Sequence, residues 1–103
     1  MRLSFWFDRV SSEGDIKHKI ARKFASLDKY LKHVSSDLRQ GVITLSRGER
    51  YGYRVRTIFK VPGREVVAEA RSKTLLTAVD SAYARAAREI RKYLDRVRDR
   101  HRR

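Results

Sequence analysis

The sequence contains no cysteine, and its three histidines, His18, His33 and His101, are scattered along the chain. A disulfide framework and a thiolate metal site are therefore excluded, and the histidines do not form a ligand cluster. No apolar run approaches the length that spans a membrane, and nothing at the N-terminus reads as a signal peptide. We therefore expect a cytoplasmic protein that needs neither a metal nor a cofactor.

Acidic residues are also scarce, since 12 Asp and Glu face 26 Lys and Arg and leave a formal charge of +14. The excess is spread over the chain and is not confined to one end. A basic proteome is the uninformative explanation, but a domain this basic is more typical of a nucleic-acid binder. An apolar content of 41% in 103 residues predicts one folded domain over residues 1–103. The sequence leaves open whether its basic end, about residues 98–103, is ordered.

Alternating apolar and polar residues predict strands at residues 2–10, 53–61 and 65–71, and a run rich in β-branched residues predicts another at residues 42–46. Pro62 and Gly63 suit the central positions of a type II turn between the strands at 53–61 and 65–71. In the first strand Leu3, Phe5 and Phe7 share the inner face. Trp6 lies on the outer face, where stacking on a base is one reading, but we expect it to pack against a neighbouring strand or to close the edge of the core.

Two segments have helical periodicity. The first carries an apolar stripe at Ile16, Ile20, Phe24, Leu27, Leu31 and Val34, with Ser12 as its expected N-cap. The second begins after Thr74, another suitable N-cap, and contains neither Gly nor Pro, so that it can run nearly to the end of the chain. Its stripe consists of Leu75, Val79, Ala82, Ala86, Ile90, Tyr93 and Val97.

The predicted order is therefore β-α-β-β-β-α, an α+β fold. Each strand has one apolar face and each helix one apolar stripe, so a four-stranded sheet with both helices on one face buries all of them. Short turns make the last three strands an antiparallel meander. The alanines at positions 68 and 70 predict that a helix lies close above the last strand.

The polar side of the second helix is strongly cationic. Between residues 74 and 103 there are nine Lys or Arg and four acids, whereas an ordinary solvated face mixes the two signs. A helix C-terminus favours one or two cations, which leaves most of this excess unexplained. Together with basic residues on the first helix and on the third strand, these side chains predict a surface with many phosphate contacts.

Particular residues resemble those of the ribosome hibernation promoting factors and ribosome-associated translation inhibitors. The family's turn and its hydrophobic-x-Ala-x-Ala strand match Gly63, Val66, Ala68 and Ala70, and its helix start matches Leu75, Ala78, Val79 and Asp80. Its Lys-Leu-x-Arg-Gln and later Lys correspond to residues 85–89 and Lys92, and its Lys-Phe-x-x-Leu-x-x-Tyr to residues 23–30. The order of elements matches over essentially all 103 residues.

This resemblance implies a fold like that of double-stranded-RNA-binding domains with an additional first strand. It implies a monomeric protein that binds ribosomal RNA in the mRNA and tRNA channel of the small ribosomal subunit and silences idle ribosomes. The chain ends at Arg103 without the dimerisation domain of the long form, so it resembles the short form. Lys23, Arg85, Arg88 and Lys92 are the contacts that the resemblance supplies. The full expected RNA-binding set is Lys19, Arg22, Lys23, Lys29, Arg54, Arg56, Arg85, Arg88, Arg91, Lys92 and Arg96.

Three other readings remain. A generic RNA or DNA chaperone would use the same charge without a defined ribosomal site. An enzyme is disfavoured because the sequence has no phosphate-cradling glycine loop and no recognisable pair of nucleophile and base, and we expect no small-molecule substrate. A basic amphipathic helix on a membrane is disfavoured because the apolar stripe of the second helix is needed to cover the sheet. We expect Asp80 to pair with a nearby Lys or Arg.

Overall fold

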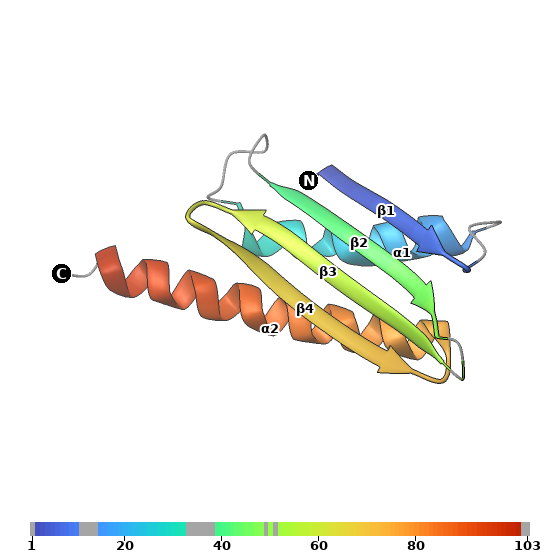
Figure 1. The fold of residues 1–103 in the computed structure, drawn as a ribbon. Coiled ribbons are helices and arrows are strands. Elements are labelled where there is room, and N and C mark those ends of the chain that lie inside the picture. Colours follow the sequence, from blue (N-terminus) through green and yellow to red (C-terminus); the bar gives the residue numbers. More distant parts are fainter. Residues whose placement is uncertain (1, 11–14, 33–38, 49, 51, 102–103) are drawn as a thin grey trace.

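A computed structural model describes residues 2–10, 15–32, 39–48, 50 and 52–101. The chain forms, in order, β1 (Arg2–Asp8), α1 (Ile16–Ala25), the short 3₁₀ helix η1 (Ser26–Tyr30), β2 (Gln40–Arg47), β3 (Tyr53–Val61), β4 (Arg64–Ser72) and α2 (Leu75–His101) (Figure 1). The α+β order β-α-β-β-β-α expected from the sequence is confirmed.

The four strands form one sheet in the order β1-β2-β3-β4. β2, β3 and β4 are an antiparallel meander, whereas β1 pairs parallel with β2. A parallel pair needs a crossover connection, which α1 and η1 supply. Gly63 has a φ of 89°, as the third position of the expected type II turn requires.

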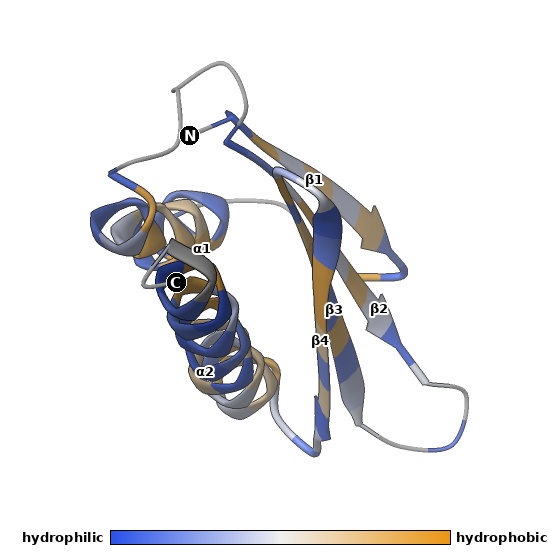
Figure 2. Ribbon diagram, turned by 90° about the vertical axis from the view of Figure 1, so that its left-hand side faces the viewer, coloured by the Kyte–Doolittle hydropathy of each residue, from blue (hydrophilic) through white to orange (hydrophobic). Residues whose placement is uncertain are grey.

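Both helices lie on the same face of the sheet, and its other face is uncovered (Figure 2). The strand residues beneath the helices alternate with exposed ones, so that Val55, Thr57 and Phe59 of β3 are fully buried. Thr57 is the one buried polar side chain among the described residues, and its hydroxyl donates to the Ala68 carbonyl at 3.1 Å. Ala68 and Ala70 are buried under α2, because small side chains let the helix approach β4 closely, as predicted.

The second helix agrees with its sequence pattern. The Thr77 N–H donates to Thr74 Oγ1 at 3.3 Å, which confirms Thr74 as the N-cap, and the helix continues to His101. The Tyr93 hydroxyl donates to the Pro62 carbonyl at 3.0 Å, which fixes the helix to the β3–β4 turn. The end of α2 projects past the sheet (Figure 1).

The first helix and the first strand differ from expectation. α1 changes to a 3₁₀ helix at Ser26, whose hydroxyl donates to the Lys23 carbonyl at 2.6 Å and so competes with the regular helical bond. Ile16, expected in the core, is 37% exposed because it begins the helix beyond the part that packs on the sheet. The N-cap Ser12 and the last stripe residue, Val34, lie outside the described residues.

β1 ends at Asp8, two residues before its expected end. Arg9 has a φ of 59°, in the left-handed region, which is incompatible with an extended strand. The expectation that Trp6 packs against a neighbour or closes the core is wrong, since 65% of its surface is exposed. Both helices cover the opposite face, so nothing among the described residues buries the indole.

Candidate nucleic-acid interface

The outer surface of the helix layer is built on direct contacts between the two helices. Lys23 of α1 pairs with Asp80 of α2, as expected for that carboxylate, at 2.5 Å between Nζ and Oδ1. One turn further, the Ser26 and Tyr83 hydroxyls are 2.9 Å apart, and the Phe24 and Tyr83 rings meet edge to face at 5.9 Å. These contacts fix the position of α1 relative to α2, and therefore the spacing between their basic side chains.

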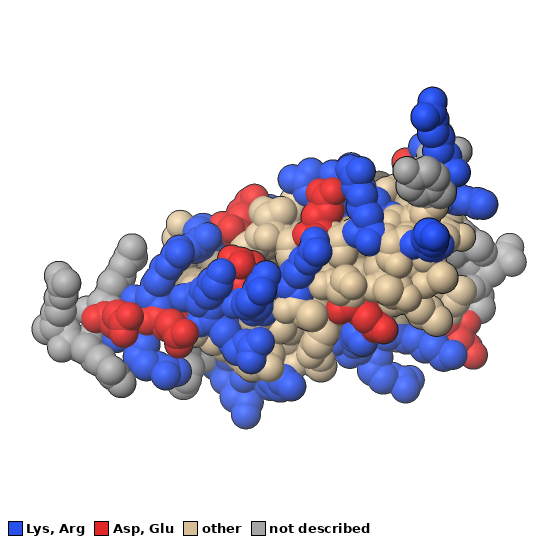
Figure 3. Space-filling model, turned by 90° about the horizontal axis from the view of Figure 1, so that it is seen from below, with Lys and Arg blue, Asp and Glu red and all other residues tan. Residues whose placement is uncertain are grey.

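Several expected RNA-binding residues are available on this surface. They are exposed, and within the part of the chain that the structure describes they have no ion-pair or hydrogen-bond partner: Lys19, Arg22, Arg88, Arg91 and Arg96. Figure 3, seen from the side of α2, shows cationic side chains gathered over the C-terminal half of that helix, with a largely uncharged stretch over its N-terminal half. We call Lys19, Arg22, Arg88, Arg91 and Arg96 the helix-face cations.

Four further expected residues of the helix layer already have internal partners. Lys23 binds Asp80 and lies 5.1 Å from the centre of the Tyr83 ring, and Lys29 lies at the same distance from Tyr30. Lys92 pairs with Glu89 at 3.3 Å. Arg85 donates to the Glu69 backbone carbonyl at 2.5 Å, so its guanidinium caps the exposed edge of β4. Their charge still contributes to the surface, but an incoming phosphate would compete with these contacts.

Arg54 and Arg56 do not join the helix surface. Both lie on the uncovered face of β3, where Arg54 is opposite Arg71 and Arg56 is opposite Glu69. Arg54 binds Glu69 with two hydrogen bonds, from Nε at 2.7 Å and from Nη2 at 2.8 Å. These hydrogen bonds lower the pKa of Glu69 and raise that of Arg54. The expected set is therefore divided between two opposite faces of the molecule.

Sequence reasoning missed a second group of cations at one end of the sheet, which consists of Arg9, Arg47, Arg71 and Lys73. The available signal was the β3–β4 register. A tight turn at Pro62-Gly63 pairs Val61 with Arg64, and counting back along both strands places Arg71 opposite Arg54. Arg9 could not be found in this way, because its position depends on the parallel pairing of β1 with β2, and the position of Arg47 depends on the register of β2 with β3.

Other kinds of site find little support in the described part of the chain. No group of three or more His, Cys, Asp or Glu side chains there is arranged to hold a metal ion. Among the same residues, none of the helices is both long and apolar enough to span a membrane.

Residues 6–98 match the sequence model of the family described as Sigma 54 modulation protein / S30EA ribosomal protein. The chain belongs to this family. The resemblance to ribosome hibernation promoting factors that the sequence carries is thereby confirmed, and ribosome association and regulation of translation are the family's functional context. The family is not known for enzymatic activity.

Solved structures agree on the fold. The N-terminal domain of Thermus thermophilus Protein Y matches with a TM-score of 0.77 and 21% identity, over 90% of this chain and 99% of that one. A ribosomal subunit interface protein from Coxiella burnetii matches with a TM-score of 0.74 and 16% identity, over 92% of this chain and 99% of that one. No curated protein sequence matches this chain. At these identities the structural matches speak for the fold alone.

Proposed function

We propose that this protein binds ribosomal RNA in the mRNA and tRNA channel of the small ribosomal subunit and blocks translation by idle ribosomes. The observation that carries the proposal is the group of helix-face cations. They lie on two helices that contact each other, and their side chains have no ion-pair or hydrogen-bond partners among the described residues. Family membership supplies the ribosome as the partner. Binding would then take place in the cytoplasm, where ribosomes work.

The chemistry of the surface suits structured RNA. Proteins meet folded RNA largely through phosphates and 2′-hydroxyls, because side chains cannot read bases in the deep major groove. Arginine presents a planar set of donors that binds a phosphate through two hydrogen bonds. Three of the five helix-face cations are arginines on α2, at positions 88, 91 and 96. Inhibition then needs no chemical step, since occupation of the channel excludes mRNA and tRNA.

A channel also explains how two opposite faces of one small protein can both be used. The helix-face cations would contact RNA on one wall of the channel, and Arg54 and Arg56 would contact RNA on the opposite wall. Arg56 is exposed and has no ion-pair or hydrogen-bond partner among the described residues, whereas Arg54 would have to share its guanidinium with Glu69. On this proposal, removing Arg56 weakens binding more than removing Arg54 does.

Co-sedimentation with purified small subunits at near-physiological salt tests the proposal, with and without prebound mRNA and initiator tRNA. Binding should saturate near one copy per subunit and be lost when the channel is filled. Arg88→Ala/Arg91→Ala should weaken it by at least about tenfold, as expected for the loss of two phosphate contacts. Arg2→Thr/Lys60→Thr removes the same charge from one end of the uncovered sheet face, about 13 Å along β3 from Arg56, and is the matched control because neither residue is a proposed RNA contact.

The generic chaperone predicts a different result. A protein that binds through charge alone would load many copies per subunit, ignore mRNA and tRNA, and lose the same affinity in both double variants. That pattern would reject the channel site and leave the family membership unaffected.

A further inference from the structure

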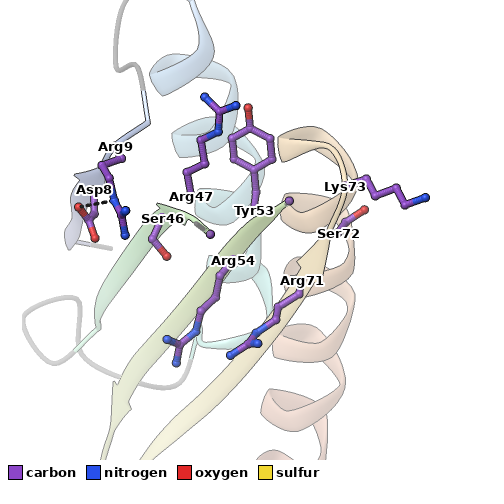
Figure 4. Close-up of a pocket in the computed structure, with 11 residues that line it drawn as sticks. Asp8, Arg9, Ser46, Arg47, Tyr53, Arg54, Arg71, Ser72 and Lys73 are labelled. Carbon is purple, nitrogen blue, oxygen red and sulfur yellow. Dashed lines mark ion pairs between the residues drawn. The ribbon is translucent and has the colours of Figure 1, made fainter. Parts of the chain in front are cut away.

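One end of the sheet contains a hollow of about 540 Å³, separate from the helix-face cations. β1, β2 and β4 end there and β3 begins there, so four neighbouring strands contribute to it (Figure 4). Its volume falls within the range of small-molecule sites, which is about 300–1,000 Å³. The residues that line it are Asp8, Arg9, Ser46, Arg47, Gly48, Gly52, Tyr53, Arg54, Arg71, Ser72 and Lys73.

The lining is strongly cationic, with five basic residues and one carboxylate. That carboxylate, Asp8, is 3.8 Å from Nε of Arg9. In Figure 4, Arg54 and Arg71 extend next to each other from neighbouring strands, whereas Lys73 points away from them. Arg47 lies over the Tyr53 ring, 5.9 Å from its centre, on the other side of the strand ends. Arg54 and Arg71 are therefore the cations best placed to share one anion, and Arg9 lines the same hollow from the end of β1.

Glu69 binds Arg54 through two hydrogen bonds and forms a longer ion pair with Arg71. Its Oε1 atom is 2.7 Å from Nε of Arg54 and 3.6 Å from Nε of Arg71. The inner edges of both guanidinium groups therefore face Glu69. Within the described part of the chain, Nη1 of Arg54 and both Nη atoms of Arg71 have no hydrogen-bond partner. Such donors, directed away from Glu69, suit the oxygens of a phosphate group.

The rim of the hollow is also restrained. The Gly48 N–H donates to the Gly52 carbonyl at 3.1 Å and so joins the two ends of the β2–β3 connection. A Cβ on Gly52 would lie 2.7 Å from the Ser72 carbonyl oxygen, so Gly52 lies against the end of β4. The Ser46 hydroxyl adds a neutral hydrogen-bonding group to the same lining.

We propose that this hollow is a phosphate-binding site that takes the phosphates of a nucleotide, with Arg9, Arg54 and Arg71 as its ligands. The nucleotide can be free in solution or part of an RNA strand, since both offer the same phosphate chemistry. The site shares Arg54 with the proposed ribosomal contacts but lies apart from the helix-face cations, on which the ribosomal proposal rests. The two proposals can therefore fail independently.

Binding can be measured on the isolated protein with tripolyphosphate, ATP and a short RNA, the last with and without a 5′-phosphate. Trp6 is the only tryptophan and lies two residues before Asp8 on β1, about 7 Å along the strand, so its fluorescence reports on the site. Tripolyphosphate does not absorb where the indole does and is the probe for this measurement. Amide chemical shifts of the wild-type protein then give the position of each ligand.

Two double variants distinguish the effect of the hollow on phosphate binding from the effect of the net charge of the protein. Arg9→Gly/Arg71→Ala removes two cations from the hollow, with glycine at position 9 because the φ of 59° there suits it. Arg88→Ala/Arg91→Ala removes the same charge from α2. We expect the first variant to weaken tripolyphosphate binding by about tenfold or more and the second by less than about threefold. Ribosome binding should show the reverse order.

The amide shifts should be largest at Ser46, Gly48, Gly52 and Ser72. If ATP and tripolyphosphate bind there, the ligand is a free nucleotide. If only RNA binds there, and Arg9→Gly/Arg71→Ala weakens it, the site serves an RNA phosphate. Equal losses in the two double variants, or shifts confined to α2, would overturn the proposal.

Discussion

Arg54 is opposite Arg71 in the sheet, yet its guanidinium reaches diagonally along β4 to Glu69, with both hydrogen bonds at or below 2.8 Å. The diagonal contact relieves repulsion between two cations that directly face each other. Glu69 therefore stabilises a surface on which neighbouring strands would otherwise place like charges together.

This pair gives stability a specific pH dependence. The hydrogen bonds from Arg54 lower the pKa of Glu69 in the folded state below its value in the unfolded chain, about 4.3. The stabilisation is therefore complete when the pH is above the pKa of Glu69 in the unfolded chain. It is lost as the pH falls through the pKa of Glu69 in the folded protein. Glu69→Gln should reduce the free energy of unfolding by about 0.2–1 kcal/mol at pH 7 and by nothing in strong acid.

Denaturant titrations of both proteins from pH 7 to pH 2 measure this difference. Glu65→Gln removes the same charge from the same strand, at a residue with no ion pair to another described residue, and should stay close to the wild type at pH 7. A Glu69→Gln deficit that persists unchanged at pH 2 would show that the carboxylate acts through packing and not through its charge.

The contact between Lys23 and Asp80 links stability to RNA binding. Asp80→Asn should lower the free energy of unfolding by less than about 1 kcal/mol, because 65% of the Asp80 side chain is exposed. It should also raise RNA affinity a few-fold, since it releases Lys23 and removes a negative charge beside the helix-face cations. Asp99→Asn, further along α2, is the control for the effect of net charge. Thermal melts and RNA titrations at one salt concentration measure both effects, and weaker RNA binding by Asp80→Asn would contradict the prediction.

Two glycines of similar backbone conformation should differ in their tolerance of alanine. Gly52 and Gly63 have φ values of 83° and 89°, so both substitutions strain the backbone, at a cost of about 1–2 kcal/mol. A Cβ on Gly63 would meet nothing within 4 Å, whereas one on Gly52 would lie 2.7 Å from a backbone oxygen. Gly52→Ala should therefore be the more destabilising by at least about 1 kcal/mol. Equal melting temperatures would mean that the β2–β3 connection moves away from Ser72 at little cost.

The N-cap of α2 can be tested by a pair of substitutions. Thr74→Ala removes the acceptor of the Thr77 N–H and should cost about 0.5–2 kcal/mol, whereas Thr74→Ser keeps the hydroxyl and should stay near the wild type. Urea denaturation measures both. A loss of equal size in the serine variant would assign the effect to the threonine methyl group and not to the cap.

Salt dependence measures the number of phosphates that the helix face meets. The logarithm of the RNA affinity should fall linearly with the logarithm of salt concentration, and Arg88→Ala/Arg91→Ala should reduce the slope by about 1.5. Arg2→Thr/Lys60→Thr should leave the slope near that of the wild type. An unchanged slope in the first variant would place the phosphates elsewhere.

The sequence by itself determined most of the architecture, because its signals are local. Alternation along β3 and the three-to-four spacing from Leu75 to Val97 depend only on the periods of strands and helices. Pro62-Gly63 and Thr74 mark their boundaries through backbone geometry and one side-chain hydrogen bond. The same local reasoning failed at Ser26, where a hydroxyl bonded to the Lys23 carbonyl ended the regular helix early.

Only the tertiary structure decided which cations act together. Local periodicity shows the face of an element on which a residue lies, but the partner across a sheet or between helices depends on packing. The contacts of Lys23 with Asp80 and of Arg85 with the Glu69 carbonyl join residues far apart in the chain. Arg9 lines the same hollow as Arg54 and Arg71 only because β1 pairs parallel with β2, and that pairing depends on the crossover through α1.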